Sequence, residues 1–205
     1  MSSESQMLDD DQLSAEDRAR ANVYALIGRL FYDAPDSNLL AQIRVDDAAG
    51  NGVSDASALE QAWRALQDAC KRAYPVALKQ EYDTLFVGVG KAQVTPYTSA
   101  YVTQSAPDRH LVKLREHLDA WKLVRNAGAF EIEDHISGLC DAMRFLIEQK
   151  ASLADQRLFF EDFVYSGALP LCEAVMTAPA SGFYKQIALF AKAFFEVEKA
   201  GLDMD

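Results

Sequence analysis

The chain has 205 residues, half of them hydrophobic and a quarter charged, and its 31 acidic against 20 basic side chains give a formal net charge of −11. A chain of this length forms one domain, at most with two lobes, and buries enough surface to fold without disulfides or a metal ion. Eleven Phe and eight Tyr exclude intrinsic disorder. The acidic balance argues against a nucleic-acid partner, because phosphate contacts need clustered basic side chains.

Cysteine spacing and the first residues indicate a cytoplasmic protein. Cys70, Cys140 and Cys172 lie 70 and 32 residues apart, which fits no zinc-binding pattern and is typical of reduced core thiols. Residues 1–13 are polar and acidic, so they predict a disordered tail and no signal peptide. The sequence contains no apolar run of about 18 residues, so membrane insertion is not expected.

The first half of the chain predicts helices separated by loops. Ser14 followed by Asp17 is typical of a capped helix start, and Pro35 stops this helix because proline disfavours helix in the residue before it. Pro75 either kinks the helix that Ser57 begins or starts a new one. Helices are expected over about 14–33 and about 37–45, then one that begins at 57 and one over 75 to about 86. Loops are expected over 46–54 and 87–107, the second with a helical turn around 98–103.

The second half shows stronger helical periodicity, most clearly from Ile136 to Ile147, in a helix that Glu133 or Asp134 would begin. Besides this helix, we expect helices over about 108–124, about 152–165 and about 182–200, the last with Gly201 as its end signal. The helix over about 152–165 is expected to be interrupted over 166–170 and to continue to about 176.

The fold class expected from these segments is all-α, since no segment alternates apolar and polar residues cleanly over six positions. We predict a helical bundle of about 8–10 helices. Residues 14–205 would form this single domain.

Two short patterns resemble chemical sites but lack the residues that such sites need. The sequence Gly88-Val89-Gly90-Lys91 is not a phosphate-binding loop, because helices flank it and Ala92 follows the lysine, so a helix C-terminal turn is expected. His110 and His117 share one helix face, but no second histidine completes a zinc motif. Both are expected at the surface, and we expect neither a metal nor a cofactor.

The most unusual local group is His135, which Glu131, Glu133 and Asp134 precede at a predicted helix start. Acids are favourable there because a helix N-terminus is positive, so a cap would explain Glu133 or Asp134 but not His135. A Ser-His-Asp hydrolase with Ser99 as nucleophile is one alternative, although the G-x-S-x-G elbow is missing.

Three motifs together resemble the TorD/DmsD/NarJ family of cytoplasmic maturation chaperones for molybdenum-cofactor oxidoreductases. They follow one another in this order: Tyr82-x-x-Leu85-Phe86-x-Gly88, Pro96-Tyr97-x-Ser99-x-Tyr101 and Glu131-x-x-Asp134-His135. The resemblance extends from about Ala21 to the last helix. The last of these motifs is usually E-P-x-D-H in the family, and Ile132 stands here in place of the proline.

The resemblance implies a chaperone that binds the twin-arginine signal peptide, or the apo form, of a molybdopterin oxidoreductase catalytic subunit. It would assist cofactor insertion and export proofreading without being an enzyme. It also implies two lobes, an N-lobe of about 14–96 and a C-lobe of about 109–205, joined by a hinge loop of about 97–108. A homodimer is left open. The motif residues carried over as peptide-binding are Pro96, Tyr97, Ser99, Tyr101, Glu131, Asp134 and His135.

The chemistry of a twin-arginine leader fits these residue types. Its basic region calls for carboxylates, and its apolar stretch calls for an aromatic-lined groove, to which Tyr97, Tyr101 and Trp63 are candidates. Asp134 and His135 are expected to face a groove between the lobes, and Glu133 to lie at the surface. The rival interpretations are a small hydrolase that uses Asp134 and His135, and an all-α interaction protein without peptide selectivity.

Overall fold

The structure is a computed structural model that describes residues 13–44, 56–88, 91–102, 107–123 and 133–204. Every structural statement below concerns these residues, so the predicted tail and the loop over 46–54 lie outside them. The helices are α2 (Ala15–Tyr32), α3 (Ser37–Ile43), α4 (Ala58–Arg72), α5 (Pro75–Tyr82), η1 (Asp83–Val87), α6 (Ser99–Val102), α7 (Pro107–Ala120), α8 (Ile136–Glu148), α9 (Leu153–Phe159), η2 (Phe160–Tyr165), α10 (Ser166–Thr177) and α11 (Phe183–Met204).

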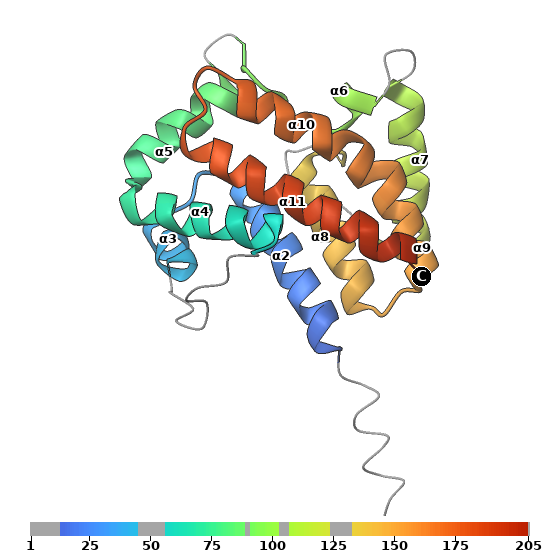
Figure 1. Ribbon diagram of the computed structural model, residues 1–205. Coiled ribbons are helices and arrows are strands. Elements are labelled where there is room, and N and C mark those ends of the chain that lie inside the picture. The colour runs from blue at the N-terminus through green and yellow to red at the C-terminus, as the bar shows by residue number, and fades with distance from the viewer. Residues whose placement is uncertain (1–12, 45–55, 89–90, 103–106, 124–132, 205) are drawn as a thin grey trace, which may run out of the picture.

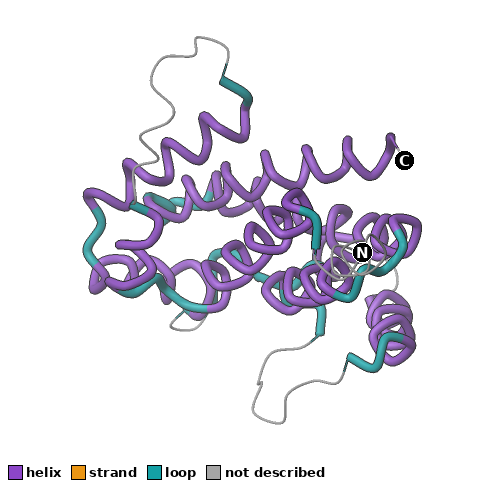
Figure 2. The backbone as a smooth tube through the Cα atoms, turned by 90° about the horizontal axis from the view of Figure 1, so that it is seen from below, coloured by secondary structure: helices purple, strands orange, loops and turns teal. Residues whose placement is uncertain are grey.

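The all-α prediction is confirmed, since helices and loops alone occur in the part of the chain that the structure describes (Figures 1 and 2). The start signals act as the sequence indicates. Ser14 accepts a hydrogen bond from the Asp17 amide, and Ser57 forms a complete capping box with Glu60. Pro75 occupies the first turn of α5, so it starts a new helix.

Two long-range packing arrangements build the core. Helix α2 packs along α8, and α11, red in Figure 1, runs between α4 and α10. One cluster of buried side chains joins these helices, and its largest members include Tyr24, Phe31, Phe160 and Phe195. The helices assigned to the N-lobe and the C-lobe therefore share one core, and the lobe division stays a prediction.

The N-terminus of α11 is fixed by a side chain from a distant helix. The Glu81 carboxylate of α5 accepts hydrogen bonds from the amides of Gly182 and Tyr184 at 2.8 Å and of Phe183 at 3.1 Å. A carboxylate is favourable there because it pairs the free N–H groups and the positive end of the helix.

The predicted interruption over 166–170 is wrong. The chain stays helical from α9 through α10, and its irregularity lies upstream, in the π-helical segment η2. Pro170 lies inside α10, where it lacks the N–H that would bond to the Ser166 carbonyl one turn earlier.

The predicted helix end at Gly201 is also wrong, because α11 continues to Met204. Burial of Leu202 and the ion pair between Lys199 and Asp203 favour the extra turn. By contrast, Gly88 ends η1 with a φ of 67°, which confirms the helix C-terminal turn expected there.

The three cysteines lie in the protein interior. Cys70, Cys140 and Cys172 are buried free thiols, and burial raises the pKa of Cys70 to about 11 and that of Cys172 to about 12. Among the described helices, none combines the length and the apolar character needed to cross a bilayer. Within the same residues, no cluster of His, Cys, Asp or Glu is arranged to hold a metal ion.

Candidate functional site

The structure brings two of the sequence motifs together in a short antiparallel bridge between Tyr97 and His135. The Thr98 amide donates to the Asp134 carbonyl and the Ile136 amide donates to the Pro96 carbonyl, each at 3.0 Å. The loop before α6 and the start of α8 are therefore one backbone-bonded unit. We call this unit, residues 95–101 with 133–137, the junction.

Asp134 stabilises the junction from inside. It is 1% exposed, and its carboxylate accepts a hydrogen bond from the Ser99 amide at 3.2 Å. Its carbonyl oxygen accepts a second bond from the Thr98 hydroxyl, also at 3.2 Å. The side chain therefore holds the start of α6 in place rather than lining an open groove.

His135 is the N-cap of α8, so a helix cap does account for this histidine, contrary to the expectation. Its Nδ1 accepts a hydrogen bond from the Ser137 amide at 3.1 Å, and the residue is 3% exposed. Its ring meets the Tyr97 ring edge to face, with centroids 5.3 Å apart. The expectation that Asp134 and His135 face an open groove is therefore not met.

The same hydrogen bond bears on the hydrolase alternative. In a Ser-His-Asp triad the Nδ1–H of histidine donates to a carboxylate, which orients the ring as a base. Here Nδ1 accepts a backbone hydrogen bond, and the Asp134 carboxylate contacts the Ser99 amide. Among the described residues, the His135 Nδ1 thus meets a backbone N–H where a triad would place a carboxylate.

Of the predicted peptide-binding residues in the first half of the junction, Tyr97, Ser99 and Tyr101 are half-buried, whereas Pro96 is buried. The Tyr101 hydroxyl donates to the Thr95 carbonyl at 2.9 Å, and burial raises its pKa. The buried members thus position three partly exposed polar or aromatic side chains.

The remaining predicted residues lie at the edges of the junction or outside it. Glu131 and Ile132 lie outside the described residues. Glu133 bonds to Arg115 of α7 at 3.1 Å and is only partly exposed. Trp63 is half-buried and packs against Phe190 of the core, with ring centroids 5.1 Å apart.

A close backbone contact that the sequence did not indicate holds the junction against α10. A Cβ atom on Gly167 would lie 2.5 Å from the Thr98 Cβ and 2.8 Å from the Thr98 carbonyl oxygen. The glycine therefore allows α10 to approach Thr98 more closely than any side chain would permit.

His110 of α7 is buried near the junction, so the expectation that it lies at the surface is wrong. Its ring packs against Phe163 with centroids 5.4 Å apart, and its Nε2 has no hydrogen-bond partner among the described residues. Burial lowers the pKa of His110, and the attraction of Asp134 and Asp162 opposes that shift only in part.

This burial predicts an acid-sensitive stability. The unfolded chain binds a proton on His110 near its ordinary pKa of 6.5, whereas the folded chain binds it only at lower pH. The stabilisation is therefore present above about pH 6.5 and lost as the pH falls towards the folded-state pKa. We expect His110→Phe to reduce the loss of unfolding free energy on acidification, as measured by urea titration at several pH values.

His117→Gln is the matched control, because His117 lies on the same helix, also packs on Phe163 and is partly exposed. Equal pH profiles for the parent and His110→Phe would contradict the assignment to His110.

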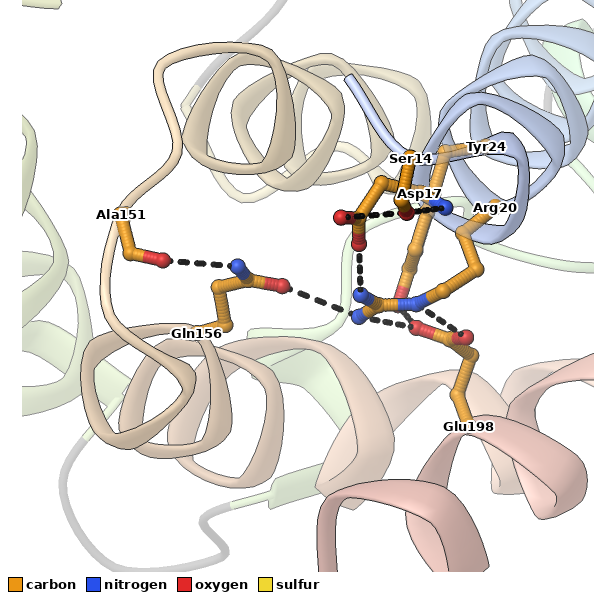
Figure 3. Close-up of polar contacts among 7 residues, drawn as sticks. All are labelled: Ser14, Asp17, Arg20, Tyr24, Ala151, Gln156 and Glu198. Atoms are coloured by element: carbon orange, nitrogen blue, oxygen red, sulfur yellow. Dashed lines mark hydrogen bonds and ion pairs between the residues drawn. The ribbon is translucent and has the colours of Figure 1, made fainter. Parts of the chain in front are cut away.

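A polar network that no sequence pattern indicates joins α2, α9 and α11 (Figure 3). Arg20 bonds through Nε and Nη2 to the two carboxylate oxygens of Glu198, at 2.9 and 3.1 Å. Its guanidinium also bonds to Asp17 at 2.9 Å and to the Gln156 amide oxygen at 3.0 Å. The Tyr24 hydroxyl donates to Glu198 at 3.1 Å. We call these five residues the Arg20 network.

The electrostatics of the Arg20 network favour its charged state. Burial alone would lower the pKa of Arg20, but the hydrogen bond and charge of Glu198 raise it above the usual value. Burial, followed by the charge of Glu198, raises the pKa of Tyr24 well above its ordinary range. The Tyr24 hydroxyl therefore stays protonated and donates to the carboxylate.

The chain is similar to a solved structure and matches a known protein family. A proposed redox enzyme maturation protein from Archaeoglobus fulgidus has a similar fold, with a TM-score of 0.52 and 22% identity over 92% of this chain and 96% of that one. Residues 54–168 match the nitrate reductase delta subunit family. The chain therefore belongs to that family, which confirms the resemblance to TorD/DmsD/NarJ-like maturation chaperones. A comparison with curated proteins found no significant match.

Proposed function

We propose that the chain is a cytoplasmic chaperone that binds the twin-arginine leader, or the apo form, of a molybdenum-cofactor oxidoreductase. Family membership carries this proposal, because the matched residues 54–168 include the whole junction. The chaperone would hold the client ready for cofactor insertion and delay its export.

The junction supports the proposal because its buried residues hold the backbone in place while other residues remain accessible. Asp134 and His135 hold the backbone, and Tyr97, Ser99 and Tyr101 remain partly exposed on the segment that leads into α6 and is bonded to the start of α8. A preordered loop loses less conformational entropy when a peptide docks. Tyrosine suits a leader because its ring packs on apolar groups and its hydroxyl meets polar ones.

We expect a leader with two adjacent arginines to bind with roughly micromolar affinity, since an extended peptide loses much conformational freedom on docking. Replacing its apolar stretch by serines should weaken binding more than replacing the arginine pair by lysines, which keeps the charge. High salt should weaken binding by less than about tenfold, because burial of apolar surface persists. Isothermal titration with the three peptides checks this.

A pair of protein variants localises the effect. Tyr97→Ala should weaken leader binding, whereas Tyr32→Ala, at an exposed tyrosine of α2, should not. Absence of binding by the cognate leader at any salt concentration would contradict the proposed function. Equal effects of the two variants would leave leader binding intact but remove the junction from it.

A further inference from the structure

A second feature of the surface is a groove of about 860 Å³ between the N-terminal half of α2 and the C-terminal half of α11. Ile147 and the segment before α9 close one side. Most of its lining is apolar, with Leu13, Val23, Leu59, Phe194, Leu202 and Met204 among the side chains. The charged part of its floor is the Arg20 network.

Large apolar side chains on the walls of this groove are exposed. Val197 and Met204 of α11 and Leu153 of α9 all line it, and each is exposed. Val197, Gly201 and Met204 recur at helical spacing, so they form one stripe along α11 that faces the groove. Exposed apolar surface gathered in a concave site is typical of a binding surface.

Gly201 adds an independent observation. A glycine inside a helix costs about 1 kcal/mol relative to alanine, so a packing reason is expected for it. Here a Cβ atom on Gly201 would meet nothing within 4 Å. The fold itself therefore does not require this glycine, whereas a ligand that approaches the α11 backbone along the groove would.

The charges at the groove favour a cationic partner. Glu16 and Asp17 from the first turn of α2 stand at its edge, and Glu198 lies in its floor. The Arg20 guanidinium is bonded to both Asp17 and Glu198, so one positive charge offsets part of two negative charges and a net negative charge remains. The lining carries three acids and two bases, in a chain with a net charge of −11.

We propose that this groove, rather than the junction alone, docks the apolar stretch of a cationic leader, with the basic residues of the leader beside Glu16 and Asp17. This inference rests on the proposed function and names the surface that carries the apolar contacts. It assigns the Arg20 network a positioning role, because that network bonds α2 to α11, the two walls of the groove.

Two matched pairs of variants test the groove. Gly201→Leu adds a side chain to the groove at a position where a Cβ meets nothing within 4 Å, and Asn22→Leu places the same side chain at an exposed position of α2 outside it. Val197→Ser removes an apolar wall, and Val112→Ser does the same on α7, where the valine has the same exposure of 51%. Each variant is titrated with the cognate leader, its thermal unfolding is recorded and its mass in solution is measured.

We expect Gly201→Leu to weaken leader binding by about tenfold or more and Val197→Ser by several-fold. Gly201→Leu should be more stable to heat than the parent, because it removes a glycine from a helix. Val197→Ser should keep the thermal stability of the parent, and the two control variants should bind as the parent does. If the leader binds every variant equally, the groove inference is wrong but the proposed function survives. A change of oligomeric state in Gly201→Leu with unchanged leader affinity would instead assign the groove to a second copy of the chain and overturn the inference.

Discussion

Replacing Glu198 by alanine is expected to lower the free energy of unfolding by about 3 kcal/mol. The substitution removes both carboxylate oxygens that Arg20 contacts and the acceptor of the Tyr24 hydroxyl. A partly buried guanidinium and a buried hydroxyl would then lack their main partner, and desolvated polar groups without partners are costly. Urea-induced unfolding followed by circular dichroism at neutral pH measures the loss.

Glu196→Ala is the matched control on the same helix. Glu196 pairs with Lys192 one turn away on an exposed face, and such pairs contribute at most about 0.5 kcal/mol. The two variants therefore remove the same group from α11 but should differ several-fold in their effect on the free energy of unfolding. Similar losses in both would show that the Arg20 network does not stabilise the contact between α2 and α11.

Gly167→Ala is expected to destabilise the protein by about 3 kcal/mol and to displace the junction. The new Cβ would approach the Cβ, the carbonyl oxygen and the Cα of Thr98 to between 2.5 and 2.9 Å. Two of these atoms belong to the backbone, so a rotamer change of Thr98 cannot relieve the clash. The loop would have to move away from α10, and the bridge between Tyr97 and His135 would weaken with it.

Amide hydrogen exchange separates this local effect from global unfolding. Thr98 and Ile136 donate the two bridge hydrogen bonds, so their amides should lose protection in Gly167→Ala even under conditions where the protein stays folded. Gly138→Ala on α8 is the control, because its Cβ would meet no described atom closer than 3.4 Å. Unchanged protection of both amides in Gly167→Ala would contradict the role assigned to Gly167.

Local physics made the helices predictable. Ser14, Ser57 and Pro75 act within one helical turn of their own positions, so their effects can be seen in the sequence. The two errors in the helix boundaries have long-range causes. Gly201 stays helical because Leu202 is buried in the core, and the break expected near Pro170 is replaced by a π-helical turn upstream.

The candidate site was predictable only in part, for the same reason. The family resemblance indicated the two motifs that form the junction, but not that Asp134 and His135 would be buried in it. Arg20 and Glu198 are 178 residues apart, and no periodicity or spacing connects them. The groove likewise arises from packing of α2 against α11, so its lining becomes visible only in three dimensions.

The proposal that this chain matures a molybdenum-cofactor oxidoreductase is tested most directly by the cofactor content of its client. The oxidoreductase whose leader binds the chain would be purified from cells with and without the chain, and its molybdenum content measured by mass spectrometry. We predict that the client lacks most of its molybdenum when the chain is absent and regains it when the unaltered chain is supplied. A fully loaded client from cells that lack the chain would contradict the proposal.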